Sequence, residues 1–150
     1  MSVGASRPSR LRWGERLGSL LVDALAVAGA GSTLAFALAG WWIPEMSPVP
    51  WLSDRGPAVP VATAALMGLL LGWRVARMAG AALQVALALV LGASGLALIL
   101  AAPATTGTLD AVQQQALASF VASRLMVSLL LTTPAALLGA SVGAARGTGR

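Results

Sequence analysis

The sequence has 150 residues, of which 57% are hydrophobic and 10% are charged. Soluble domains carry about 25% charged residues, so this composition excludes an ordinary water-soluble domain. The formal net charge is +5 and all ten basic residues are arginine. These arginines lie between apolar runs rather than on one face, which argues against a nucleic-acid partner.

The residue types that are missing restrict the chemistry further. The chain has no cysteine, histidine or lysine, which excludes disulfides, imidazole chemistry and a lysine-containing phosphate loop. The five carboxylates are spread along the chain, so no paired-acid mechanism is expected. We therefore predict no catalytic residue, no cofactor, no metal site and no enzyme activity.

Four long apolar runs predict an all-α integral membrane bundle of four transmembrane helices. We expect a basic N-terminal segment (1–16), a transmembrane domain (17–146) and a short tail (147–150). The spans are predicted at about 17–43, 60–78, 81–102 and 116–143, with a proline-rich outer loop at 44–59. Because arginine is the sole basic residue in a chain rich in alanine and glycine, a bacterial plasma (inner) membrane is the expected location.

The first span follows a short basic helix expected at Arg10–Gly18. Trp13 and Arg16 are predicted to anchor its start at the membrane interface, and Trp41 and Trp42 its end. A cleaved signal peptide is the alternative interpretation. We favour a retained span, because the apolar run exceeds the usual ~7–15 residues and contains Asp23.

The second span has only a short apolar part before Arg74, so Arg74 and Arg77 are expected to snorkel to the cytoplasmic interface. Gly80 is expected to end this helix and to make a tight hairpin with the third. Asp110 or Thr108 is predicted to cap the fourth helix, which contains Pro134 as a hinge candidate or a static kink.

Arginines at both ends of the chain and in the hairpin place both termini on the cytoplasmic side, by the positive-inside rule. Small residues at every fourth position predict close helix packing. The ridge residues are Ala64, Gly68, Gly72, Ala76 and Gly80 in the second span, and Ser128, Thr132, Ala136, Ala140 and Ala144 in the fourth, where Gly139 and Gly143 add a second pair spaced by four.

Asp23 and Arg124 are the unusual charges within spans, and such residues are candidates for an ion or proton site or for an ion pair. We expect Asp23 to be paired or to lie near the inner interface. An Asp23–Arg124 bridge is conceivable, but a reach of Arg124 toward Asp110 or the headgroups is preferred.

The expected function is that of a structural or accessory subunit that packs through its small-residue faces. Its partners would be membrane lipids and other membrane subunits or further copies of itself. A small oligomeric transporter or channel with Asp23 and Arg124 near the pathway is one alternative. A holin-like, lesion-forming protein is another, supported by size and span number alone.

Overall fold

The computed structural model describes residues 9–43, 56–75, 77–102, 107 and 109–147, and side chains from residue 16 onward, except at residue 76. Its helices are α1 (Ser9–Trp42), α3 (Ala58–Val75), α4 (Met78–Ala101) and α5 (Ala111–Gly147). All four are long and apolar enough to span a membrane, and the described ranges contain no strand. The expected all-α architecture with four long apolar helices is confirmed.

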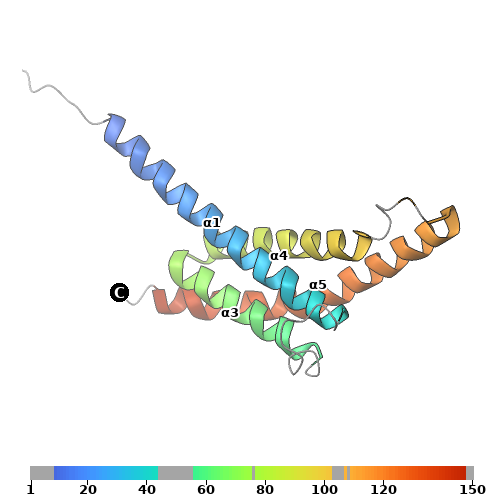
Figure 1. Cartoon of the computed structure of the whole chain (residues 1–150). Helices are drawn as coiled ribbons and strands as arrows, with labels where there is room; N and C mark the ends of the chain where they lie inside the picture. The colour runs from blue at the N-terminus through green and yellow to red at the C-terminus, as the bar shows by residue number, and fades with distance from the viewer. Residues whose placement is uncertain (1–8, 44–55, 76, 103–106, 108, 148–150) are drawn as a thin grey trace, which may run out of the picture.

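Helix α1 is longer than the expected first span, because the predicted basic helix at its start is continuous with it. No proline interrupts the 34 residues of α1, whereas Pro8 and Pro44 stand just outside its two ends. The blue N-terminal half of α1 extends away from the other helices, and its cyan C-terminal half lies against them (Figure 1). The long helix therefore crosses the bundle obliquely.

The turn between α3 and α4 is made at Arg77 and not at Gly80. Arg77 has extended backbone angles (φ −134°, ψ 123°) and immediately precedes α4. Gly80 lies in the first turn of α4, where an added Cβ would be 2.6 Å from Val75 Cγ1. The expectation that Gly80 ends the helix is wrong: the glycine instead lets α4 return close to the end of α3.

Helix α5 begins at a reciprocal cap, as the sequence predicts for Asp110. The Asp110 carboxylate accepts a hydrogen bond from the Gln113 backbone N–H at 2.8 Å, and Gln113 Oε1 accepts one from the Asp110 N–H at 3.0 Å. This capping box satisfies otherwise free N–H groups at the helix start. Pro134 is exposed within α5, and the helix continues past it with a bend between its orange and red parts (Figure 1).

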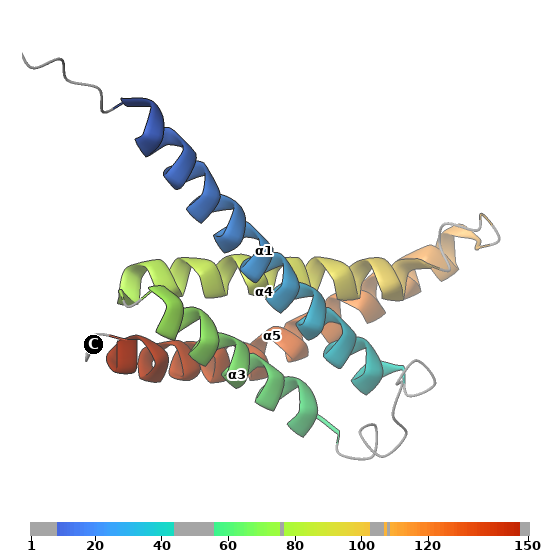
Figure 2. The same ribbon diagram turned by 60° about the vertical axis from the view of Figure 1, so that its left-hand side comes forward.

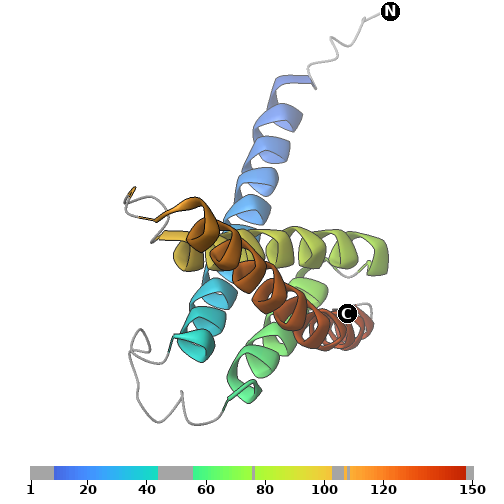
Figure 3. The same ribbon diagram turned by 90° about the vertical axis from the view of Figure 1, so that its right-hand side faces the viewer.

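The helices pair in parallel, α3 with α5 and α1 with α4. The two helices of each pair run in the same direction. Gly68 and Gly72 of α3 face Ala136 and Ala140 of α5, in that order, and the contacts of α1 with α4 follow the same order. Figures 2 and 3 show that the two members of each pair cross at an angle, with α1 running across α4 and α3 across α5. The core between them is formed by buried alanine, valine and leucine side chains, including Leu34, Leu38, Val85 and Leu96.

Two ends of the bundle are used as reference points below. The hairpin end contains Asp23 of α1 together with Arg74 and Arg77. The tryptophan end contains Trp42 of α1 and Ser128 of α5.

Candidate functional site

The closest contact in the bundle joins the backbones of α3 and α5. A Cβ added at Gly68 or Gly72 would overlap the carbonyl oxygen of Ala136 or Ala140, respectively. From the other side, a Cβ at Gly139 would overlap the carbonyl oxygen of Ala65. Glycine is required here because no side chain fits between the two backbones, and this close approach maximises van der Waals contact.

The predicted ridge residues lie on this contact. Gly143 faces the backbone of Leu69 and Trp73, and the remaining described ridge members of the two helices, apart from Gly80, are buried. Those buried members are Ala64, Ser128, Thr132, Ala136, Ala140 and Ala144. Ala76, which the sequence also assigns to the ridge, lies outside the described residues.

A second small-residue contact, between α1 and α4, was not expected. A Cβ at Gly31 would be 2.7 Å from Leu91 Cβ and 3.0 Å from the Ala88 carbonyl oxygen. On α4, a Cβ at Gly95 would be 2.9 Å from Ala35 Cβ. Gly31, Ala35 and Ala39 are buried and repeat every four residues, so the spacing used for the other helices also marks this face.

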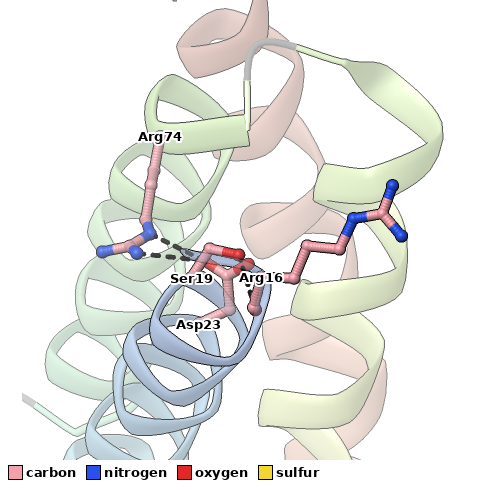
Figure 4. A network of polar contacts seen from close by, with 4 residues as sticks. All are labelled: Arg16, Ser19, Asp23 and Arg74. Atoms are coloured by element: carbon pink, nitrogen blue, oxygen red, sulfur yellow. Dashed lines mark hydrogen bonds and ion pairs between the residues drawn. The ribbon is translucent and has the colours of Figure 1, made fainter. Parts of the chain in front are cut away.

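Asp23 forms an ion pair with Arg74 at the hairpin end (Figure 4). Asp23 Oδ1 accepts a hydrogen bond from Arg74 Nε at 3.0 Å and lies 3.0 Å from Arg74 Nη2 in the ion pair. The two side chains are 40% and 39% exposed, respectively, so water screens the pair and its contribution to stability is about 0–1 kcal/mol. Asp23 is therefore a paired carboxylate, and its partner is Arg74.

The neighbours of this pair have separate contacts. Figure 4 shows Arg16 pointing away from Asp23, and the Ser19 hydroxyl donates to the Arg16 carbonyl oxygen at 2.9 Å. Arg16 and Arg77 are both exposed. Of the three arginines named here at or near the hairpin end, Arg74 is neutralised by Asp23.

At the tryptophan end, α1 is tied to α5 by Trp42. Its indole Nε1 donates to Ser128 Oγ at 2.8 Å, and Trp41 stacks on it with ring centroids 3.9 Å apart. Trp41 and Trp42 are half-buried. Both stay predicted interface anchors, and the structure shows that Trp42 forms a contact between α1 and α5.

Arg124 lies against the same tryptophan. Its Cζ is 4.1 Å from the centroid of the Trp42 ring and 4.9 Å from that of Phe120, distances typical of cation–π contacts. Arg124 pairs with neither expected carboxylate: Asp23 pairs with Arg74, and the Asp110 carboxylate caps its own helix. Asp110 and Arg124 are 14 positions apart, about 21 Å along α5, which is beyond the reach of an arginine side chain. The expected reach toward the headgroups stays a prediction.

Two buried polar atoms have no hydrogen-bond partner among the described residues, Gln84 Oε1 and Arg124 Nε. The hydroxyl of Thr132, by contrast, donates to the Ser128 carbonyl oxygen at 2.7 Å. No group of three or more metal-ligating acids, histidines or cysteines comes together in the described part of the chain. The Trp13 side chain lies outside that part.

An apolar groove of about 550 Å³ lies between α1 and α3, and Arg74 contributes to its lining. Comparisons of the chain with protein-family models, with curated proteins and with solved structures gave no match. Arguments about function therefore depend on the geometry described above.

Proposed function

We propose that this chain is a multi-pass membrane protein that acts as a structural or accessory subunit, without catalytic chemistry of its own. The observation that carries this proposal is the distribution of apolar surface. Only 22–33% of the residues in the apolar window of each helix are buried inside the bundle. The outward surface includes large apolar side chains such as Leu25, Phe36, Leu98 and Leu130, which are costly to expose to water.

The spacing of the polar groups supports a bilayer as the surrounding medium. Asp23 and Trp42 are 19 positions apart in α1, which corresponds to about 28 Å along the helix at 1.5 Å per residue. A hydrocarbon core is about 30 Å thick. In this arrangement the hairpin end lies at the cytoplasmic interface of a bacterial inner membrane, and the tryptophan end lies at the opposite interface.

An accessory role is favoured over transport because the described parts of the helices offer few free polar groups. The hydroxyls of Thr33, Thr63 and Thr132 each donate to a carbonyl oxygen four residues earlier. Asp23 lies at one end of the bundle and is paired. A conduction pathway needs polar groups that replace the water around the ion or substrate. The described helices place no row of such groups along a common path.

Membrane insertion and orientation are tested with single-cysteine variants, since the chain has no cysteine of its own. Cysteine at exposed Met78 or Ala145 is expected to resist an impermeant thiol reagent in whole cells, and cysteine at exposed Ala111 to react. Labelling of either inside position from outside, or recovery of the protein in the supernatant after ultracentrifugation, would contradict the proposal.

The accessory role itself is tested by native purification and mass spectrometry of co-purifying chains. We expect a stoichiometric partner subunit or a defined homo-oligomer. Solute flux in liposomes that is lost in Asp23→Asn would instead favour a transporter. Dye leakage from vesicles on addition of the protein would favour a lesion-forming protein.

A further inference from the structure

The groove between α1 and α3 is bounded by mainly small residues on the α1 wall, with Leu25 as the exception, and by larger apolar ones on the α3 wall. Ala26, Gly29 and Ala30 form part of the α1 wall, and Leu66 and Leu70 part of the α3 wall. A Cβ added at Gly29 would meet no atom within 4 Å. The groove is therefore open space beside α1, and a larger side chain at Gly29 could fill it without moving neighbouring atoms.

The polar groups of the groove are concentrated at one end. Thr33 and Thr63 also line it, but their hydroxyls donate to the Gly29 and Val59 carbonyl oxygens at 2.8 and 2.9 Å. The charged side chain in the lining is Arg74, at the hairpin end. A molecule that fills the groove must accordingly be apolar along most of its length and polar at the end beside Arg74.

The size of the groove suits hydrocarbon chains. From Thr63 to Arg74 the groove follows 11 residues of α3, or about 16 Å. Its volume is about 550 Å³, within the range of about 300–1,000 Å³ that is typical of ligand pockets. The charges at the end of the groove indicate which kind of molecule carries those chains.

Arg74 lines the end of the groove, and its partner Asp23, just outside the lining, places a charge of opposite sign beside it. Both contacts of the pair use Asp23 Oδ1, a hydrogen bond from Arg74 Nε and an ion-pair contact with Arg74 Nη2. Asp23 Oδ2 and Arg74 Nη1 take no part in them, and both side chains are partly exposed. A headgroup with an anionic and a cationic part matches this arrangement better than a purely anionic headgroup, which Asp23 would repel.

We propose that the α1–α3 groove binds a phospholipid with a phosphoethanolamine headgroup. Its acyl chains occupy the apolar groove, its phosphate accepts hydrogen bonds from Arg74 Nη1, and its ammonium group donates to Asp23 Oδ2. This inference depends on the proposed membrane location. It adds a specific lipid ligand to a protein whose general embedding in lipid would not require one.

Binding of the acyl chains in the groove is tested by native mass spectrometry of the full-length protein in mild detergent, titrated with phosphatidylethanolamine. Gly29→Leu fills the groove, and Gly18→Leu is the matched control because a Cβ there also meets nothing within 4 Å and Gly18 does not line the groove. We expect Gly29→Leu to weaken binding at least about tenfold, and Gly18→Leu to bind as the unmodified chain does. Equal binding by both variants would overturn the proposal.

The headgroup is tested with phosphatidylethanolamine, phosphatidylcholine and phosphatidylglycerol of identical acyl chains. Phosphatidylethanolamine should bind about tenfold more tightly than phosphatidylcholine, whose quaternary ammonium cannot donate, as expected for one charge-assisted hydrogen bond. Asp23→Asn should remove most of this preference. Preference for phosphatidylglycerol, or no preference among the three, would overturn the headgroup assignment.

These outcomes are separable from failure of the proposed function. Thiol labelling and ultracentrifugation report membrane insertion whether or not a lipid is retained. A protein that inserts as proposed but shows no phosphatidylethanolamine preference overturns the lipid site alone.

Discussion

The glycine contact between α3 and α5 leads to a quantitative prediction for Gly68→Ala. The added Cβ would overlap the Ala136 carbonyl oxygen and stand 2.8 Å from its carbonyl carbon. Carbon atoms pack at about 3.5–4.0 Å, so relief of the overlap requires the helices to separate by about 0.7 Å or more. Overpacking of this kind costs about 1–3 kcal/mol, part of which is offset by alanine's higher helix propensity of up to about 1 kcal/mol.

We therefore expect Gly68→Ala to lower the free energy of unfolding by about 1–2 kcal/mol. The measurement is reversible unfolding in mixed micelles with increasing sodium dodecyl sulfate, followed by far-ultraviolet circular dichroism. Gly29→Ala is the control, since its Cβ meets nothing within 4 Å and the change should be neutral or stabilising. If the two variants unfold alike, the two backbones are not in contact at Gly68.

A second substitution in the same contact sharpens the test. Gly139→Ala should carry a similar cost, because its Cβ would overlap the Ala65 carbonyl oxygen. Once one methyl group has separated the helices, the other meets less resistance, so the double variant should lose less stability than the sum of the two single losses. Simple additivity would show that each methyl is accommodated locally and would refute the shared separation.

Three further predictions concern the polar groups, each measured by the same unfolding assay. Trp42→Phe should cost about 0.5–1.5 kcal/mol through loss of the hydrogen bond to Ser128 Oγ, and a double-mutant cycle with Ser128→Ala should show coupling; additive effects would exclude the bond. Asp23→Asn and Arg74→Gln should each change stability by less than about 1 kcal/mol because the pair is partly exposed, and a larger loss would show that the pair is desolvated. Gln84→Leu should stabilise the protein by about 1 kcal/mol or more, since it removes a buried acceptor without a partner; a loss of stability would point to a partner for Gln84.

The helices and the α3–α5 contact follow from local patterns in the sequence. Long apolar runs bounded by prolines indicate where α1 can begin and end, and Asp110 with Gln113 has the spacing of a capping box. Small residues repeating every four positions in two helices indicate that both backbones can approach a neighbour. These features depend on residues close in the chain, which is why they are readable without the fold.

The ion pair and the arginine–tryptophan contact depend instead on how the helices cross. The oblique path of α1 places Asp23 beside Arg74, which is 51 positions later, and Trp42 beside Ser128, which is 86 positions later. No local sequence pattern predicts the tilt of α1. One missed contact face could, however, have been predicted from the sequence. Its small residues, Gly31, Ala35 and Ala39, repeat every four positions like those of the other ridges.

The parallel pairing of α3 with α5 has a consequence for biosynthesis. Gly143 is made 71 positions after Gly72, a delay of about 4–14 s at 5–20 residues per second. During that interval the glycine face of α3 has no partner of its own and is open to any neighbouring helix with a small-residue face. In those seconds, before α5 packs against α3, a chaperone or a second nascent chain can bind the glycine face of α3.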